Sequence, residues 1–162
     1  MKLHLNYLLS LVIVVFDQTL KYYMAALLPL CRPGHCETIE LLPFFKLIVA
    51  HNTGAAFSFL ATAGGWQRWF LVAVSCGVSG VIIVWLHRLG QEQRLLAASL
   101  TLILGGAIGN LIDRLLQGYV VDFILLHYGS FHFPAFNIAD TAITLGAALY
   151  ILDMLLSRKD AA

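Results

Sequence analysis

The stretch Gly105-Gly-Ala-Ile-Gly-Asn-Leu-Ile-Asp-Arg114, continued by Gly118-Tyr-Val-Val-Asp122, ends a long apolar segment with polar and charged side chains. A charged side chain at membrane depth costs about 2.5–3.5 kcal/mol even on lenient scales, so it is rare and usually faces protein or water. Asn110, Asp113 and Arg114 have the i, i+3, i+4 spacing that places them on one helix face. The stretch predicts a membrane helix whose polar end either joins helices or supports a functional site.

The composition extends this interpretation to the whole chain. Its 162 residues are 60% hydrophobic and 12% charged, whereas soluble domains are about 45–50% apolar and about 25% charged. The net charge is +1 and there is no basic run, so nucleic acid is not an expected partner. The chain is predicted to be an integral membrane protein in contact with lipid.

Several apolar segments have the length of about 20 residues that a helix needs to cross the hydrocarbon core. We predict an all-α membrane protein with four transmembrane helices and one domain over residues 1–162. The predicted spans are about 5–28, 69–86, 95–116 and 138–156, and loops 29–68 and 117–137 lie on one side.

The two loops contain strand-like runs, at about 38–42, 44–49, 55–60 and 119–126, with turns at Asn52-Thr-Gly54 and Tyr128-Gly-Ser130. Because isolated hairpins are marginal in water, we expect a small β element that rests on the membrane surface. Cys31 and Cys36 share the first loop, where either a local disulfide or two free thiols is consistent with the sequence.

Basic residues indicate the orientation of the spans. One side of the predicted topology carries Lys2, Arg88, Arg94, Arg158 and Lys159. By the positive-inside rule that side is cytoplasmic. Both termini are therefore predicted in the cytoplasm, and both loops are extracytoplasmic.

This topology brings most of the polar residues of the spans to one level near the extracytoplasmic face. Asp17 and Lys21 form an i, i+4 pair, and buried charges usually pair, so mutual neutralisation is favoured over direct chemistry. The residues at this level are Asp17, Lys21, Asn110, Asp113, Arg114, Asp122, Asn137 and Asp140.

Asp122 and Asp140 have no basic residue within four positions. Two such carboxylates brought together repel, and one holds a proton at neutral pH. That is the equipment of an aspartyl protease, although a proton relay in a small transporter or two helix caps would use the same residues. The absence of an inverted repeat makes the transporter less attractive. The histidines show no spacing typical of metal ligands, at His35, His51, His127 and His132.

Four sequence blocks resemble one known family. They are Asp17-Gln-x-x-Lys21, Asn52-x-Gly-Ala-Ala-Phe57, Gly105-Gly-Ala-x-Gly-Asn-Leu-Ile-Asp-Arg114 with Val120-Val-Asp-Phe123, and Phe136-Asn-x-Ala-Asp140. In this order they are similar to the lipoprotein signal peptidases, or signal peptidase II, which are bacterial membrane aspartyl proteases.

The resemblance implies four transmembrane helices, an extracytoplasmic β-cradle and a short helix in the second loop. It implies catalytic roles for Asp122 and Asp140, and Asn52 and Asn137 are candidates to hold the substrate backbone or the oxyanion. The other implied substrate-binding or supporting residues are Gly54, Asn110, Asp113, Arg114, Asp17 and Lys21.

The implied reaction removes the signal peptide of a prolipoprotein just before a cysteine that carries diacylglycerol. The family pattern requires no metal or cofactor, and globomycin-like cyclic peptides are expected inhibitors. We expect a monomeric, multi-pass enzyme of the bacterial inner membrane, with its active site at the extracytoplasmic face.

Overall fold

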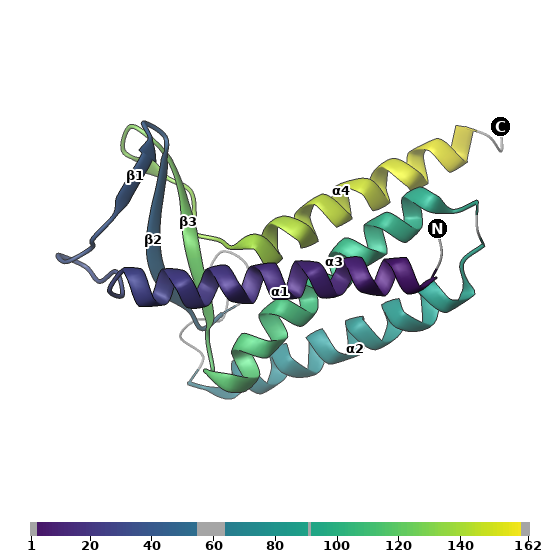
Figure 1. The fold of residues 1–162 in the computed structure, drawn as a ribbon, viewed down its shortest axis with the longest axis horizontal. Coiled ribbons are helices and arrows are strands. Elements are labelled where there is room, and N and C mark those ends of the chain that lie inside the picture. The colour runs from purple at the N-terminus through teal and green to yellow at the C-terminus, as the bar shows by residue number, and fades with distance from the viewer. Residues whose placement is uncertain (1–2, 55–63, 91, 160–162) are drawn as a thin grey trace.

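The computed structural model describes residues 3–54, 64–90 and 92–159. Four long helices form the bundle in Figure 1, and each is long and apolar enough to cross a membrane. Their bounds are α1 Leu3–Leu27, α2 Trp66–Arg88, α3 Arg94–Leu116 and α4 Ile138–Lys159. The four predicted long apolar helices are confirmed, and α2 extends beyond its predicted range at both ends.

Helix α3 lies in the middle of the bundle and contacts the other three helices. Its small residues allow this. A Cβ added at Gly106 would collide with the carbonyl oxygen of Ala139 in α4. A Cβ added at Gly109 would lie 2.8 Å from a carboxylate oxygen of Asp17 in α1. Small side chains let helix backbones approach closely in lipid, so these glycines bring the polar residues of α1, α3 and α4 together.

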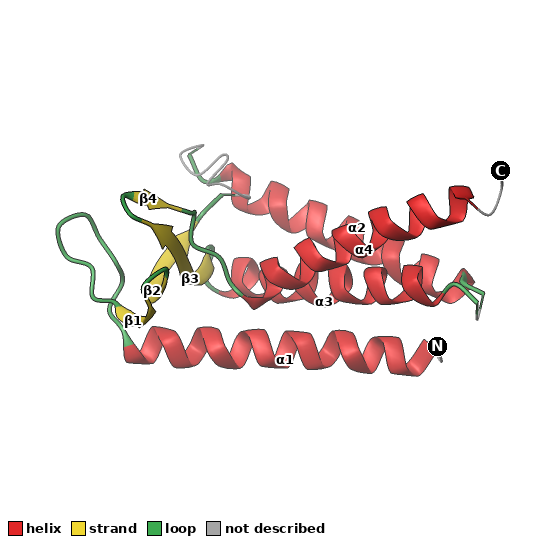
Figure 2. Cartoon of the chain, turned by 90° about the horizontal axis from the view of Figure 1, so that it is seen from above, coloured by secondary structure: helices red, strands yellow, loops and turns green. Residues whose placement is uncertain are grey.

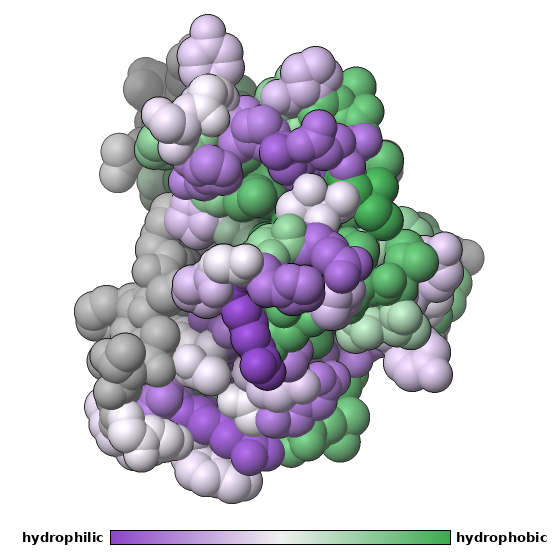
Figure 3. All heavy atoms as spheres, turned by 90° about the vertical axis from the view of Figure 1, so that its left-hand side faces the viewer, coloured by the Kyte–Doolittle hydropathy of each residue, from purple (hydrophilic) through white to green (hydrophobic). Residues whose placement is uncertain are grey.

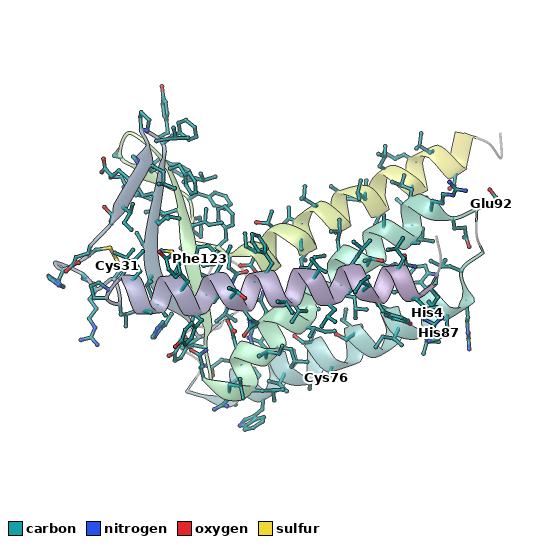
Figure 4. All side chains as sticks on the ribbon, viewed as in Figure 1. His4, Cys31, Cys76, His87, Glu92 and Phe123 are labelled. Carbon is teal, nitrogen blue, oxygen red and sulfur yellow. A yellow bond between two sulfur atoms is a disulfide. The ribbon has the colours of Figure 1, made fainter. Side chains whose placement is uncertain are left out.

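The extramembrane element is a four-stranded antiparallel sheet in the order β1-β2-β3-β4, which stands across one end of the bundle (Figure 2). The strands are β1 Ile39–Leu42, β2 Phe45–Asn52, β3 Val120–Tyr128 and β4 Phe131–His132. Val49, Val121 and Phe123 pack against Met24 near the end of α1, and Figure 4 shows Phe123 on the side of the sheet that faces the helices. This contact fixes the sheet on the bundle.

The second loop differs from the family expectation in one element. Residues 117–137, all of which the structure describes, contain β3 and β4 and no helix. Gly118 has a left-handed backbone with φ 85° directly after α3, and the β-branched Val120 and Val121 then pair with β2. The expected short helix is wrong for this chain because the segment completes the sheet instead. The predicted strand at 55–60 lies outside the described residues.

The first loop is closed by a disulfide between Cys31 and Cys36, one of the two states that the sequence left open. The amide of Cys31 donates to the carbonyl of Val49 in β2 at 2.8 Å, and Arg32 and His35 exchange backbone hydrogen bonds around a turn at Gly34. The loop projects away from the helices (Figure 1).

Candidate active site

Asp122 reaches the bundle from the sheet. It lies in β3 opposite Ala50 of β2, between Val121 and Phe123, whose side chains belong to the apolar cluster at the end of α1. Because side chains alternate across a strand, Asp122 points to the other face, and its side chain is 2% exposed. The strand register therefore places a single carboxylate next to the helix ends.

Asp140 reaches the same place from the first turn of α4. Asn137 precedes this helix, and its Oδ1 accepts a hydrogen bond of 2.9 Å from the amide of Asp140. A second amide of the same turn, that of Ala139, donates to Oδ1 of Asp17 at 2.8 Å. An asparagine cap and a nearby carboxylate satisfy the free amides at a helix start, so α4 begins at a position fixed by α1.

Two asparagine side chains connect the two aspartates. Nδ2 of Asn137 donates to Oδ1 of Asp122 at 2.7 Å and lies 3.3 Å from Oδ1 of Asn110. Nδ2 of Asn110 then donates to Oδ1 of Asp140 at 2.7 Å. Nδ2 of Asn52 donates to the other oxygen of Asp122 at 3.1 Å. Each aspartate therefore accepts at least one hydrogen bond from a side-chain amide, and each carboxylate can still accept a further hydrogen bond.

Behind the asparagines lies a buried ionic cluster around Lys21. Its Nζ contacts Oδ2 of Asp17 at 2.8 Å and Oδ2 of Asp113 at 2.9 Å, and it donates to Oδ1 of Asn110 at 3.0 Å. Asp113 also accepts the amide of Val121 at 3.1 Å. Because Lys21 is bound on three sides and is 2% exposed, the cluster joins α1, α3 and β3.

Arg114 holds the turn that follows β2. Its Nη2 donates to the carbonyl of Gly54 at 3.0 Å, while the amide of Gly54 donates to Oδ1 of Asn52 at 3.0 Å. Arg114 is 9% exposed. The guanidinium therefore fixes the turn that carries Asn52 beside Asp122.

Gln18 and Arg68, for which the sequence predicted no role, also support the site. Nε2 of Gln18 donates to Oδ1 of Asp113 at 2.8 Å and to the carbonyl of Gly109 at 3.1 Å. Arg68, in the first turn of α2, donates from Nε and Nη2 to the carbonyls of Arg114 and Leu115 at 2.8 and 2.7 Å. The adjacency of Gln18 to Asp17 was an available signal, whereas nothing near Arg68 in the sequence indicated its contact with α3.

A cavity of about 590 Å³ borders these residues and extends between α2, α3 and α4. Its polar lining includes Asp140, Asn52, Asn110 and Arg114, and the rest is mainly apolar. The apolar lining residues are Leu71, Val74, Val78, Ile103, Ala107 and Leu126, with others from residues 133–136 and from α4. A mainly apolar cavity with a few convergent polar groups is typical of a ligand site.

The electrostatic state of Asp122 follows from its surroundings. Burial raises the pKa of its carboxyl, and the charge of Asp140 raises it further, whereas hydrogen bonds from Asn52 and Asn137 and the charge of Lys21 lower it. The resulting pKa is about 7, compared with an ordinary value of 3.8. A carboxyl with this pKa is available both to donate and to accept a proton near neutral pH.

All the site residues predicted from the sequence lie in this network. Asp122 and Asp140 are at its centre, next to Asn52, Asn110 and Asn137. The residues behind them are Gly54, Asp113, Arg114, Asp17 and Lys21. The structure thus brings the predicted set together.

Comparison with known proteins identifies the family. The family model described as Signal peptidase (SPase) II matches residues 9–156. The lipoprotein signal peptidase of Ectopseudomonas mendocina is 51% identical over 156 residues, which cover 95% of this chain and 89% of the relative. That of Pseudomonas putida is 49% identical over 152 residues, covering 93% and 86%.

Solved structures agree with the sequence relatives. A bacterial membrane enzyme with 28% sequence identity superposes with a TM-score of 0.85, covering 98% of this chain and 92% of that one. A second bacterial membrane enzyme gives 0.79 at 29% identity, with coverage of 94% and 93%. The fold is therefore that of a multi-pass bacterial membrane enzyme, and the chain belongs to the signal peptidase II family of aspartic peptidases, the lipoprotein signal peptidases.

Proposed function

We propose that Asp122 and Asp140 are the catalytic dyad with which this lipoprotein signal peptidase removes signal peptides from prolipoproteins. The bond cleaved in this proposal precedes a cysteine that carries diacylglycerol. One observation supports the dyad above all. The two carboxylates lie at opposite ends of a continuous amide chain formed by Asn137 and Asn110, and Asp140 lines the apolar cavity.

The two carboxylates have different surroundings, and this supports different roles. Asp122 is almost fully buried, and its pKa of about 7 keeps a proton available on it at neutral pH. Asp140 lines the cavity and lies in the first turn of α4, where the peptide dipoles favour a negative side chain. We assign the acid role to Asp122 and the base role to Asp140.

The reaction needs no other group. The Asp140 carboxylate takes a proton from water, and the resulting hydroxide forms a bond to the scissile carbonyl carbon while the Asp122 carboxyl donates a hydrogen bond to the carbonyl oxygen. When the tetrahedral intermediate collapses, the carbon–nitrogen bond breaks and the leaving nitrogen takes a proton from the dyad. The products are a signal peptide carboxylate and a lipoprotein with a free cysteine amine.

The asparagines of the network position the dyad in this proposal. Nδ2 of Asn137 donates to Asp122, and its Oδ1 accepts the amide of Asp140, so both polar atoms of this side chain already act on the dyad. Asn52 is partly exposed and lines the cavity. Of the two candidates for holding the substrate backbone or the oxyanion, Asn52 is the one with access to it.

The cavity supports a lipid-modified substrate. Its walls are mainly apolar side chains of α2, α3 and α4, and its charged and amide side chains gather at the sheet end. A signal peptide and acyl chains are themselves apolar, while the peptide bond to be cut is polar. The cavity can therefore receive the apolar parts at membrane depth and present the peptide bond to Asp140.

Single asparagine variants test the dyad. Asp122→Asn and Asp140→Asn keep the shape of the side chain and remove its acid–base function, which typically contributes a factor of about 10²–10⁴. We expect loss of cleavage of a purified diacylglyceryl prolipoprotein in either variant. Asp153→Asn, near the other end of α4, is the matched control and should cleave normally. Wild-type rates in either dyad variant would refute the assignment.

We further propose that the sheet lies on the extracytoplasmic side. Arg88 and Arg94 lie at the opposite end of the bundle, close to His87 and Glu92 in Figure 4, and the positive-inside rule places that end in the cytoplasm. A reporter that is active only in the cytoplasm, fused after α4, should be active. The same reporter inserted in the loop between α1 and β1 should be silent, and activity there would reverse the orientation.

The enzyme is proposed to act as a monomer. Globomycin-like cyclic peptides are proposed to inhibit it by occupying the cavity. The amphipathic lining described above supports binding of an apolar cyclic peptide whose polar groups reach Asp140. Such a peptide should inhibit cleavage competitively with the prolipoprotein. Val74→Trp, which fills the cavity from α2, should weaken that inhibition, and unchanged inhibition would argue against this binding site.

A further inference from the structure

The two hairpins of the sheet turn at the same end. Leu42 pairs with Phe45, and Tyr128 pairs with Phe131, so each turn has two residues. The amide of His127 donates to the carbonyl of Phe44 at 2.9 Å and holds the two turns side by side. We call the large exposed side chains at these turns the sheet tip: Leu42, Phe44, Tyr128 and Phe131.

The side chains of the sheet tip are large and exposed. Three of the four turn residues, Pro43, Gly129 and Ser130, are of the kind that turns normally carry. Phe44 and the strand residues that flank the turns are not: the exposed fractions are 48% for Leu42, 52% for Phe44, 87% for Tyr128 and 68% for Phe131. Residues 41–45 and 128–136 contain no aspartate, glutamate, lysine or arginine. Large exposed apolar and aromatic side chains gathered at two neighbouring turns indicate an interaction site.

The position of the sheet tip indicates what covers it. In Figure 1 the sheet stands across the bundle, and its turns reach sideways on the side of α4, at the level where the helices end. Exposed aromatic residues lie at the corresponding ends of α1 and α2. They are Tyr22 and Tyr23 near the end of α1 and Trp66 and Trp69 at the start of α2, with exposed fractions of 80%, 59%, 56% and 61%.

Helix α4 lacks such residues at this level. It has no aromatic residue between Ile138 and Leu149, although tyrosine and tryptophan are enriched at membrane–water interfaces on other spans. The sheet tip supplies aromatic side chains on this side of the bundle. The end face of the molecule, by contrast, is hydrophilic over much of its middle (Figure 3), which fits contact with water.

We propose that the sheet tip inserts into the interfacial region of the lipid bilayer beside α4. Tyr128 and Phe131 lie among the headgroups, Leu42 and Phe44 lie next to them, and the sheet is held flat against the bilayer. β3, which carries Asp122 and lines the cavity through Leu126, is thereby supported at both ends, by α1 and by lipid. The inference concerns membrane contact and is independent of the dyad assignment.

Spin labels can measure the depth of the sheet tip. The free thiol of Cys76 is first removed as Cys76→Ala. In this background a nitroxide is attached at Phe131→Cys and, separately, at Tyr128→Cys. The matched control is Thr38→Cys, an exposed position in the loop that projects away from the helices. Each labelled protein is reconstituted in phosphatidylethanolamine–phosphatidylglycerol vesicles, and power saturation is recorded with oxygen and with a water-soluble nickel chelate.

We expect a positive depth parameter at positions 128 and 131, because oxygen concentrates in lipid and the chelate is excluded from it. The parameter at position 38 should be negative. Nickel accessibility at the sheet tip equal to that at position 38 would overturn the inference. Protection from both reagents would also overturn it, since it would mean that protein and not lipid covers the sheet tip.

Discussion

Replacing Lys21 by methionine tests the idea that one buried cation holds the site together. Methionine has nearly the same length and no charge, so the change removes the contacts of 2.8 Å to Asp17 and 2.9 Å to Asp113 with little loss of volume. At an effective dielectric constant of about 20, each contact contributes about 6 kcal/mol of Coulomb attraction. Both carboxylates stay buried, at 0% and 1% exposed, and their desolvation cost remains.

The expected net loss is smaller than the sum of the two attractions. Breaking a buried ion pair by removing one partner costs about 3–5 kcal/mol, and we expect the upper end because Lys21 serves two carboxylates. A loss of about 5 kcal/mol raises the equilibrium constant for unfolding by more than about 10³-fold. The double variant Lys21→Met/Asp113→Asn, which removes one of the stranded charges, should recover part of this loss.

The assay is reversible unfolding by dodecyl sulfate in mixed micelles, followed by circular dichroism. The matched control is Lys46→Met, because the ion pair of Lys46 with Glu40 lies on the exposed sheet surface and exposed pairs contribute little. If Lys21→Met destabilises the protein no more than Lys46→Met does, the ionic cluster is not what joins α1 to α3. The absence of any recovery in the double variant would contradict the charge argument specifically.

Three further predictions follow from the site and the packing. Because the dyad must hold one proton and the pKa of Asp122 is about 7, kcat/KM should fall as the pH rises through about 7. Asn52→Ala removes a hydrogen bond that lowers this pKa, so the alkaline limb of the pH profile should move to higher pH. If the limb does not move, it does not report the titration of Asp122. Arg68→Lys keeps the charge but loses the paired hydrogen bonds to the end of α3. We expect kcat to fall several-fold while the protein still inserts in the membrane. An unchanged kcat would show that Arg68 does not position the site. Gly106→Ala should destabilise the bundle strongly in the micelle assay, whereas Gly80→Ala, where a Cβ meets nothing within 4 Å, should not; equal effects would refute the close-packing argument.

The sequence alone did not decide the redox state of Cys31 and Cys36 or the secondary structure of the second loop. Two cysteines five residues apart are compatible with either redox state until the backbone brings Arg32 and His35 together around Gly34. Residues 117–137 carry strand-like runs, yet the family resemblance implied a helix there. The structure resolves the conflict in favour of the local sequence, because Val120 and Val121 find partners in β2.

The sequence by itself determined the four spans, the level of the polar residues and the identity of the two candidate catalytic aspartates. The reason is that hydrocarbon penalises charge so heavily that each polar exception in an apolar segment is informative without any knowledge of its neighbours. The i, i+4 spacing of Asp17 and Lys21 likewise predicted their contact, because it is local to one helix.

Only the tertiary structure decided which distant groups these residues contact. The amide of Ala139 binds Asp17 across 122 positions, Gln18 binds Asp113 across 95, and Arg68 binds the end of α3 across 46. Such partners depend on how each helix is rotated and how closely it approaches its neighbours. That geometry arises from glycines such as Gly106 and Gly109 and from the register of β3, and no local pattern encodes the pairing.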